Sequence, residues 1–368
     1  MDLERHCAGH SKSNLDITTA SRTVTASTRS EISGTRRLQH GGGFLAFVSL
    51  AVWLCGLLAA SSDAAAKSIT LARGIYWDEG YKYIPQGFTS RADYFKAMGI
   101  SEVHIWLNDN ERDSDNKLPR CNSFTYTDSH GNPRWTKDSL VTFTRELQSA
   151  KIKPIYTFSP QVQSDEYIDS LSGSEGPLAI AREEGGIDIE LDIEGNWRTD
   201  KLLAPCGKGD AGLLTQKLVD AIKGKNEPAG QSGRLQLIVS TTSGMAHWNS
   251  ELIDAADVLA PQLYDKRYAL TQLQIAAEMK TTWLKLAKPI IAALTVECQK
   301  NDFTNHKCSE TIFDEGLRYV AGLAQCGPSG THILSYVVWS EAAGLGHSSF
   351  GQTYLLKTKN QPIETNCN

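Results

Sequence analysis

The chain has 368 residues, of which 21% are charged and 40% are hydrophobic, and its formal net charge is -5. This is the composition of an ordinary globular protein. No basic stripe stands out and the net charge is negative, which argues against a nucleic-acid partner.

The N-terminal part of the chain has a different composition from the rest. Residues 1–43 are rich in Ser and Thr and are predicted to be disordered. Within residues 44–66, an apolar run over 44–60 is followed by Ser-Ser-Asp and three alanines, and Arg36 and Arg37 precede it. This order is typical of a secretory signal peptide, with cleavage after Ala66. Because the region before the apolar run is long, an uncleaved signal-anchor is the alternative. We therefore expect a secreted protein, or a membrane-anchored one if the leader stays.

The number of cysteines agrees with the predicted export of the protein. Removal of the leader would discard Cys7 and Cys55. It would leave an even number of cysteines, at positions Cys121, Cys206, Cys298, Cys308, Cys326 and Cys367. Six cysteines allow three disulfides in an oxidising compartment, but the sequence does not choose among the pairings. A Cys298–Cys308 bond would close a polar loop. Because no Cys-x-x-Cys or paired-histidine spacing occurs, we expect no metal and no cofactor.

From residue 67 onward, strand-like apolar runs alternate with segments of helical spacing. The strand-like runs are residues 69–77, 103–107, 153–158, 187–194, 235–240, 258–264, 289–294 and 333–339. The helical segments include residues 91–98, 138–150, 213–223, 270–286 and 310–324. This alternation predicts parallel βα units that close into a single (β/α)8 TIM barrel over residues 67–368. An open doubly wound sheet is the alternative, although no Gly-x-Gly-x-x-Gly follows the first run.

The fourth strand-like run carries a row of acids. Asp188, Glu190, Asp192 and Glu194 alternate strictly with Ile187, Ile189, Leu191 and Ile193. A period of two predicts a strand with one apolar face and one acidic face. Neighbouring carboxylates repel one another and keep a proton more readily, which suits a proton donor near neutral pH. The alternative is an edge strand whose acids lie in water.

Aromatic and polar residues gather at the predicted ends of the strands. In a TIM barrel the catalytic residues lie at the C-terminal ends of the strands. Sugar rings pack their C–H faces on aromatic rings, and their hydroxyls bond to carboxylates and amides, so this combination favours a carbohydrate site. The alternative is that each ring packs under its own loop. The aromatic candidates are Trp77, Trp106, Trp197, Tyr264 and Trp339.

Three of these features resemble glycoside hydrolase family 18, which contains chitinases and endo-β-N-acetylglucosaminidases. Residues 186–194 are similar to the family's Asp-x-x-Asp-x-Asp-x-Glu signature. Residues 262–265, Gln-Leu-Tyr-Asp, resemble its Met/Gln-x-Tyr-Asp/Asn element, and Trp339 resembles the ring beneath the reacting sugar. If Glu194 is the terminal glutamate, Glu190 replaces the middle Asp, and Ile187 stands where the first Asp belongs. In the other register the acid position falls on Asp192.

The resemblance implies a hydrolase that cleaves β-linked N-acetylglucosamine in chitin, peptidoglycan or N-glycans, with the substrate's own N-acetyl oxygen as nucleophile. Glu194 would be the general acid and base. Asp192 would orient the acetamide, and Tyr264 would bind its carbonyl. Glu190 would tune the charge on Asp192. The remaining residues implied in substrate binding are Gln262, Asp265, Trp339, Trp77, Trp106 and Trp197.

Two other functions stay open at this point. The first is a catalytically inactive sugar-binding or inhibitor-like barrel that keeps the aromatic rim. The second is a hydrolase with a conventional carboxylate pair, in which a second acid partners Glu194. The candidates for that second acid are Asp78, Glu79, Asp109 and Glu341.

Overall fold

The computed structural model describes residues 67–78, 83–108, 123–127, 132–160, 164–193, 211–224, 233–247, 249–265, 268–295, 310–327, 332–339 and 349–365. They belong to one unit of the chain, Ala64–Asn368. The predicted disordered segment and the predicted leader, residues 1–66, lie outside the described residues.

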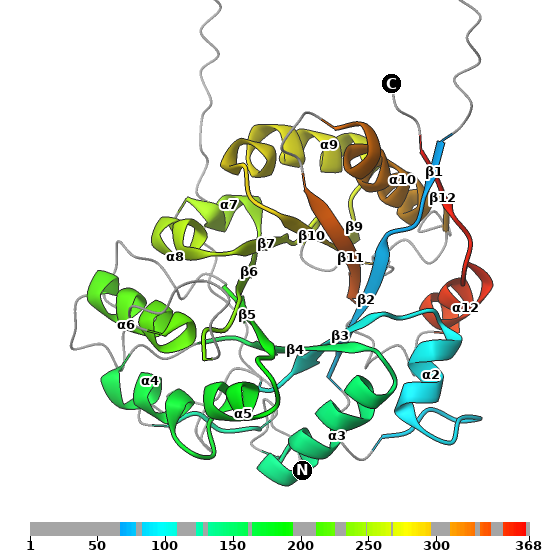
Figure 1. The fold of residues 1–368 in the computed structure, drawn as a ribbon. Coiled ribbons are helices and arrows are strands. Elements are labelled where there is room, and N and C mark those ends of the chain that lie inside the picture. The colour runs from blue at the N-terminus through cyan, green and yellow to red at the C-terminus, as the bar shows by residue number, and fades with distance from the viewer. Residues whose placement is uncertain are drawn as a thin grey trace, which may run out of the picture. The chain divides into compact units, whose positions relative to one another are not determined.

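Eight parallel strands close into a barrel, seen as a ring in Figure 1. In chain order they are β2 (Ala72–Trp77), β3 (Glu102–Trp106), β4 (Lys153–Phe158), β5 (Asp188–Asp192), β6 (Leu237–Thr241), β7 (Val258–Pro261), β10 (Ile290–Thr295) and β11 (Ile333–Trp339). The last strand, β11, pairs with the first, β2, and this pairing closes the ring. The predicted (β/α)8 fold is confirmed, and the open-sheet alternative is wrong because no free edge remains.

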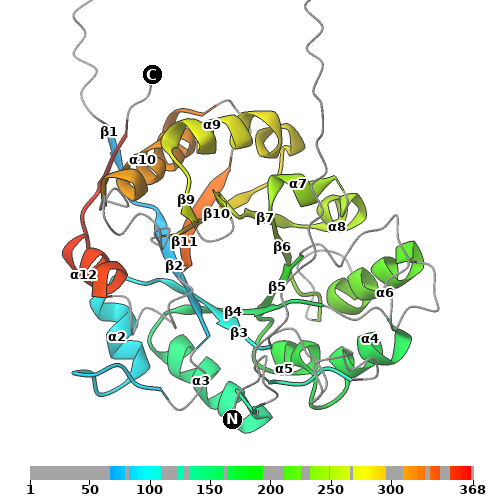
Figure 2. The same cartoon turned by 180° about the vertical axis from the view of Figure 1, so that it is seen from behind.

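Helices surround the ring on its outside, as the views from both sides show (Figures 1 and 2). They are α2 (Arg91–Ala97), α3 (Lys137–Ser149), α4 (Asp165–Ser172), α5 (Pro177–Glu183), α6 (Ala211–Lys223), α7 (Ser243–Ala246), α8 (Ser250–Ala255), α9 (Gln272–Thr281), η1 (Trp283–Leu286), α10 (Glu310–Cys326) and α12 (Ser349–Lys357). Several begin at a capping hydroxyl: Thr136 and Thr271 form capping boxes at the starts of α3 and α9. Such caps satisfy backbone N–H groups of the first turn that have no partner within the helix.

Two of the predicted strand-like runs are divided in the structure. The run 69–77 gives β1 (Lys67–Ile69), which lies outside the barrel and pairs antiparallel with β12 (Ile363–Thr365), and then β2. The run 258–264 gives β7 and, after it, the first residue of a small ladder of β8 (Tyr264–Asp265) and β9 (Tyr268–Ala269). Both divisions fall at points where the chain leaves the barrel wall.

The strands bury both faces. Their outward side chains pack under the helices and form the larger hydrophobic cluster. Their inward side chains fill the barrel. The apolar inward residues come mainly from β6, β7, β10 and β11 and include Ile238, Val258, Ala260, Ile291, Ala293 and Val337. Most of the polar inward residues come from β3, β4 and β5. The interior is therefore apolar on the side of β6, β7, β10 and β11 and polar on the side of β3, β4 and β5.

Two observations in the described residues bear on the predictions of a membrane anchor and of disulfide bonds. No helix in this part of the chain is long and apolar enough to cross a membrane. Cys326, the last residue of α10, is disulfide-bonded, and its partner cysteine lies outside the described residues. Three disulfides stay a prediction. The proposed Cys298–Cys308 pair lies outside the described residues.

Candidate active site

The acidic row of β5 lies in the wall of the barrel, with its acids directed inward. β5 pairs with β4 on one side and β6 on the other, so the edge-strand alternative is wrong. Ile189 and Leu191 are fully buried in the outer cluster beneath the helices. Because side chains alternate along a strand, Asp188, Glu190 and Asp192 face the interior at successive levels.

Asp188 occupies the lowest level, at the N-terminal end of the strands. Its carboxylate forms an ion pair with Lys153 on β4, with 2.5 Å between Oδ2 and Nζ. The Asp188 side chain is 13% exposed, so this pair reaches solvent at that end. This acid therefore has a structural partner at the end of the barrel opposite to the one where TIM-barrel chemistry takes place.

Glu190 occupies the middle level and is fully buried. Three other strands each supply one group that binds its carboxylate. The Tyr76 hydroxyl donates to Oε1 at 2.6 Å, and the Thr157 hydroxyl donates to Oε2 at 3.0 Å. His104 Nδ1 also contacts Oε2. An ionised carboxylate buried without partners costs several kcal/mol, and these donors offset that cost.

His104 lies between two carboxylates. Its other ring nitrogen, Nε2, faces Glu102 Oε1 at 3.7 Å, and the Ser335 hydroxyl donates to the same oxygen at 2.5 Å. Burial by itself lowers the pKa of His104, but the charge of Glu190 and the contacts on both sides raise it to about 9. Burial raises the pKa of Glu102, but His104 and Ser335 outweigh burial and hold that pKa below its ordinary value.

The hydroxyl of Tyr76 is a permanent donor. Burial raises the pKa of Tyr76 well above its ordinary value, and the negative charge of Glu190 raises it further. The phenol therefore keeps its proton throughout the physiological range and offers it to Glu190. Tyr76 also packs its ring on that of His104, with 5.0 Å between the ring centroids.

Asp192 occupies the upper level, towards the C-terminal end of β5. It is 8% exposed. The Gln262 side chain donates to Asp192 Oδ1 at 2.6 Å and lies 3.4 Å from the Ser240 hydroxyl. Gln262 follows β7 and bridges to Ala293 on β10, which fixes it in the barrel wall. An amide thus holds one oxygen of Asp192 in a defined direction.

Aromatic rings belong to the same interior cluster. Tyr264 and Trp339 stack face to face, with 5.2 Å between centroids and 11° between planes. Trp106 lies edge-on to Tyr76 at 6.5 Å. Trp106 and Trp339 are the last residues of β3 and β11 and are half-buried. These rings therefore lie at the same end of the barrel as Asp192.

Trp77 is not part of this group. It is fully buried on the outer side of β2, where its ring packs against Phe95 and Phe143 at 5.1 and 6.4 Å. Since Tyr76 faces the interior, the next residue must face the helices. The prediction that Trp77 binds substrate is wrong.

Several predicted site residues cannot be placed. Glu194 and Trp197 lie outside the described residues, as do Glu79, Asp109 and Glu341. Asp265 is the second residue of β8 and pairs with Tyr268, but its side chain is not described. Asp78 directly follows β2 and is half-buried.

The sequence analysis missed Tyr76, Glu102, His104 and Thr157. A signal for two of the four was present. Glu102, His104 and Trp106 are separated by apolar Val103 and Ile105, which is the same period of two that marked β5. Tyr76 was missed because its neighbour Trp77 was chosen as the substrate-binding ring at the end of this strand, and Trp77 faces the helices.

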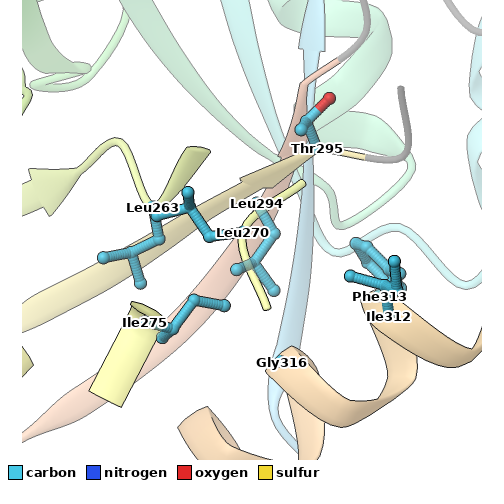
Figure 3. A pocket seen from close by; sticks show the side chains of 8 residues that line it. All are labelled: Leu263, Leu270, Ile275, Leu294, Thr295, Ile312, Phe313 and Gly316. Carbon is cyan, nitrogen blue, oxygen red and sulfur yellow. The ribbon is translucent and has the colours of Figure 1, made fainter. Parts of the chain in front are cut away.

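No group of three His, Cys, Asp or Glu side chains in the described ranges could hold a metal ion. A small pocket lies apart from the acids, between β10 and the helices α9 and α10 (Figure 3). Its lining is almost entirely apolar: Leu263, Leu270, Ile275, Leu294, Thr295, Ile312, Phe313 and Gly316. It lacks the polar groups that a sugar needs, so it is not the candidate site.

Comparison with known proteins gives similarities of fold. No family model and no curated protein matches the chain. Among solved structures, a fungal β-1,4-galactanase aligns with a TM-score of 0.50 and 13% identity, over 79% of this chain and 100% of that one. A GH113 β-1,4-mannanase aligns at 0.48 and 12%, over 80% and 99%. A chitinase from Rhizomucor miehei aligns at 0.43 and 12%, over 77% and 98%. The galactanase similarity supports the barrel fold, and at this identity it does not extend to the substrate.

Proposed function

We propose that the chain is a glycoside hydrolase that cleaves β-linked N-acetylglucosamine-containing glycans by substrate-assisted, retaining catalysis. One observation carries this proposal: Glu190 and Asp192 face the inside of a closed barrel, and the rings of Tyr264 and Trp339 lie at the same end of the barrel as Asp192. Rings and carboxylates at the C-terminal mouth of a barrel provide what a sugar needs, an apolar face and hydrogen-bonding groups.

The acids of the row have different roles because they lie at different levels in the barrel. Glu190 is fully buried and already binds three groups, so it cannot reach a substrate. Asp192, one level higher, orients the acetamide of the sugar and stabilises the positive charge that develops when the acetamide oxygen attacks the anomeric carbon. Tyr264 binds the acetamide carbonyl, and Trp339 stacks beneath the sugar ring.

We assign the proton transfers to Glu194. It is the next acid of the row, two residues after Asp192 and with the same parity as Glu190 and Asp192 in the sequence. As general acid it gives its proton to the glycosidic oxygen, and as general base it then takes a proton from water. The structural roles of Asp188 and Glu190 favour this register over the one in which Asp192 is the acid.

The experiment is hydrolysis of aryl glycosides and oligomers of N-acetylglucosamine by the wild type and by Glu194→Gln. Because Gln cannot donate the proton, we expect kcat/KM to fall by about a hundredfold or more, with an unchanged circular dichroism spectrum. Asp188→Asn is the matched control, since it removes a carboxylate of the same row at the opposite end, and it should keep its activity.

Other outcomes select other functions. Binding of the oligomers by the wild type without turnover would select the inactive sugar-binding barrel. Loss of activity in Asp192→Asn, with activity kept in Glu194→Gln, would move the acid to Asp192. Turnover of other glycosides alone would point to a conventional pair of carboxylates.

We further propose that the enzyme acts outside the cell, where polymeric glycans are found. The apolar segment 44–60, the small-residue region 61–66 after it and the even number of cysteines that follow support export. N-terminal sequencing of the protein recovered from culture medium would show cleavage after Ala66, whereas recovery with the membrane would indicate an uncleaved anchor.

A further inference from the structure

The function proposed above does not use His104, although this residue has an unusual position. It is fully buried near the centre of the barrel. Its two ring nitrogens point to two different carboxylates, Nδ1 to Glu190 and Nε2 to Glu102. A neutral imidazole has only one N–H, so it can donate to one of these acids and must turn a lone pair towards the other. Only the imidazolium carries an N–H towards both carboxylates. Towards Glu102 this N–H stays at ion-pair distance, 3.7 Å, without a hydrogen bond.

The neighbourhood of His104 is built around this arrangement. Gly74 on β2 faces Glu102, and a Cβ at that position would lie 2.8 Å from Glu102 Cγ and 3.0 Å from Oε1. The absence of a side chain there makes room for the carboxylate. Ser335 on β11 then holds the same oxygen from another strand. The second carboxylate is therefore placed by three strands, which is more than an accidental contact requires.

The charged and titratable groups around this histidine come from several strands. They are Tyr76 on β2, Glu102 on its own strand, and Glu190 on β5, with Lys153 near Glu102 and with Asp192 and Tyr264 near Tyr76. A positive ring between the two carboxylates reduces the size of the net negative charge of the cluster. A neutral ring would leave two buried negative charges at close range.

We propose that His104 is a positioning residue of the site: a buried cation between Glu190 and Glu102 that holds the Glu190 carboxylate in a fixed position beneath Asp192. This inference rests on the proposed function, because its consequence is the charge and direction of Asp192 during catalysis. His104 itself does not touch the substrate. It acts through Glu190, whose oxygens it shares with Tyr76 and Thr157.

The first test reads the charge of the ring and does not need activity. The probe is the full chain with ¹⁵N-labelled histidine, and the His104 signals are identified by their loss in His104→Asn. At pH 7 we expect the two ring nitrogens to have the similar shifts of an imidazolium, with titration near pH 9. In Glu102→Gln the titration should move down by about one pH unit or more, because a favourable negative charge is gone.

The second test reads the role in catalysis. Asn can still donate a hydrogen bond to Glu190 but carries no charge. Loss of this positive charge beneath Asp192 favours the protonated form of that acid, so the acid limb of the kcat/KM–pH profile should move up by about one pH unit in His104→Asn. A merely structural histidine would lower activity at every pH and leave the limb in place. His332→Asn, the same change at an exposed histidine before β11, is the control and should leave the profile unchanged.

The outcomes are distinct. A neutral His104 ring at pH 7, or an acid limb that stays in place in His104→Asn, would overturn the inference. If His104→Asn does not fold, Glu102→Gln keeps the imidazole and its titration decides the question. If the wild type hydrolyses none of the glycans, the proposed function fails, and the nitrogen shifts still show whether the buried cation exists.

Discussion

Three acids of the row on β5 have the same spacing but different surroundings, and these surroundings decide what each acid does. Asp188 forms an ion pair that reaches solvent, Glu190 is enclosed by three donors, and Asp192 is held by an amide. The period of two predicted that these residues share one face of a strand. It could not predict their partners, because Tyr76, His104 and Gln262 come from strands far away in the sequence.

Replacement of Tyr76 by Phe tests the hydroxyl that binds Glu190. The ring packing on His104 is kept, but one of the donors to a fully buried carboxylate is lost. Hydrogen bonds to charged groups contribute about 1.5–3 kcal/mol, so we expect a loss of this size in the free energy of unfolding, measured with urea. Activity should also fall, because Glu190 is held less firmly.

The control for Tyr76→Phe is Tyr319→Phe on α10, at a half-buried tyrosine outside the barrel interior. The same hydroxyl is removed, and the unfolding free energy should change by less than about 0.5 kcal/mol. An equal loss of unfolding free energy in the two variants would show that the hydrogen bond from Tyr76 to Glu190 does not stabilise the fold.

At the scale of elements, long periodic segments were predicted well and short ones were not. The runs 153–158 and 333–339 coincide with β4 and β11. The helices α4 and α5 were missed, because seven or eight residues show a period only weakly, although the equally short α2 was predicted as residues 91–98. Their signals are local instead: the Ser164 side chain caps α4, and Pro177 begins α5. Pro is favoured in a first turn because its missing N–H costs nothing there.

Gly316 in α10 offers a test of how an element packs on the barrel. It lines the apolar pocket between α10 and β10 (Figure 3), and a Cβ there would lie 2.7 Å from Ile275 Cδ1. That atom is the end of a flexible side chain that lines the same pocket, so it has room to move. Gly within a helix costs about 0.5–1 kcal/mol relative to Ala. We expect Gly316→Ala to raise the unfolding free energy by about 0.5 kcal/mol.

Gly322→Ala, in the same helix but not in the pocket lining, gives the backbone contribution for comparison. The difference between the two variants, measured by thermal and urea unfolding, reports the packing contribution alone. A loss of more than about 1 kcal/mol in Gly316→Ala would mean that Ile275 cannot shift and that the pocket does not relax.

At the scale of the whole molecule, the barrel itself was predictable, but the way its ends are joined was not. Alternating strands and helices fix the order of the βα units. In contrast, the pairing of β1 with β12 joins residues 67–69 to residues 363–365, and three residues on each side leave no periodic signal. The sequence predicts which residues of a strand share one face. It does not predict that the polar inward residues gather on one side of the barrel and the apolar ones on the other, because this depends on which strands become neighbours.

Arg73 joins the first and last parts of this unit. It lies on the outer side of β2 and is nearly buried. Its guanidinium donates to the Tyr336 hydroxyl on β11 at 2.7 Å and to the backbone carbonyl of Met98 after α2 at 2.8 Å. It also reaches the carbonyls of Leu355 in α12 and Thr358 just after it, at 3.0 and 3.1 Å. One side chain therefore holds the closing strand and the C-terminal helix against the first strand.

Arg73→Met keeps most of the apolar stem and removes every one of these donors. A buried carbonyl left without a donor costs about 1–3 kcal/mol, and part of this is regained because a buried charge is also removed. We expect a net loss of about 2–4 kcal/mol in unfolding free energy, and cleavage by protease within residues 349–365 before the barrel unfolds. Arg145→Met removes an exposed arginine that pairs with Glu184, and it should cost less than about 1 kcal/mol. If the two variants lose the same stability, or if the C-terminal segment resists cleavage in Arg73→Met, then the ring is closed by strand pairing alone and Arg73 does not join its ends.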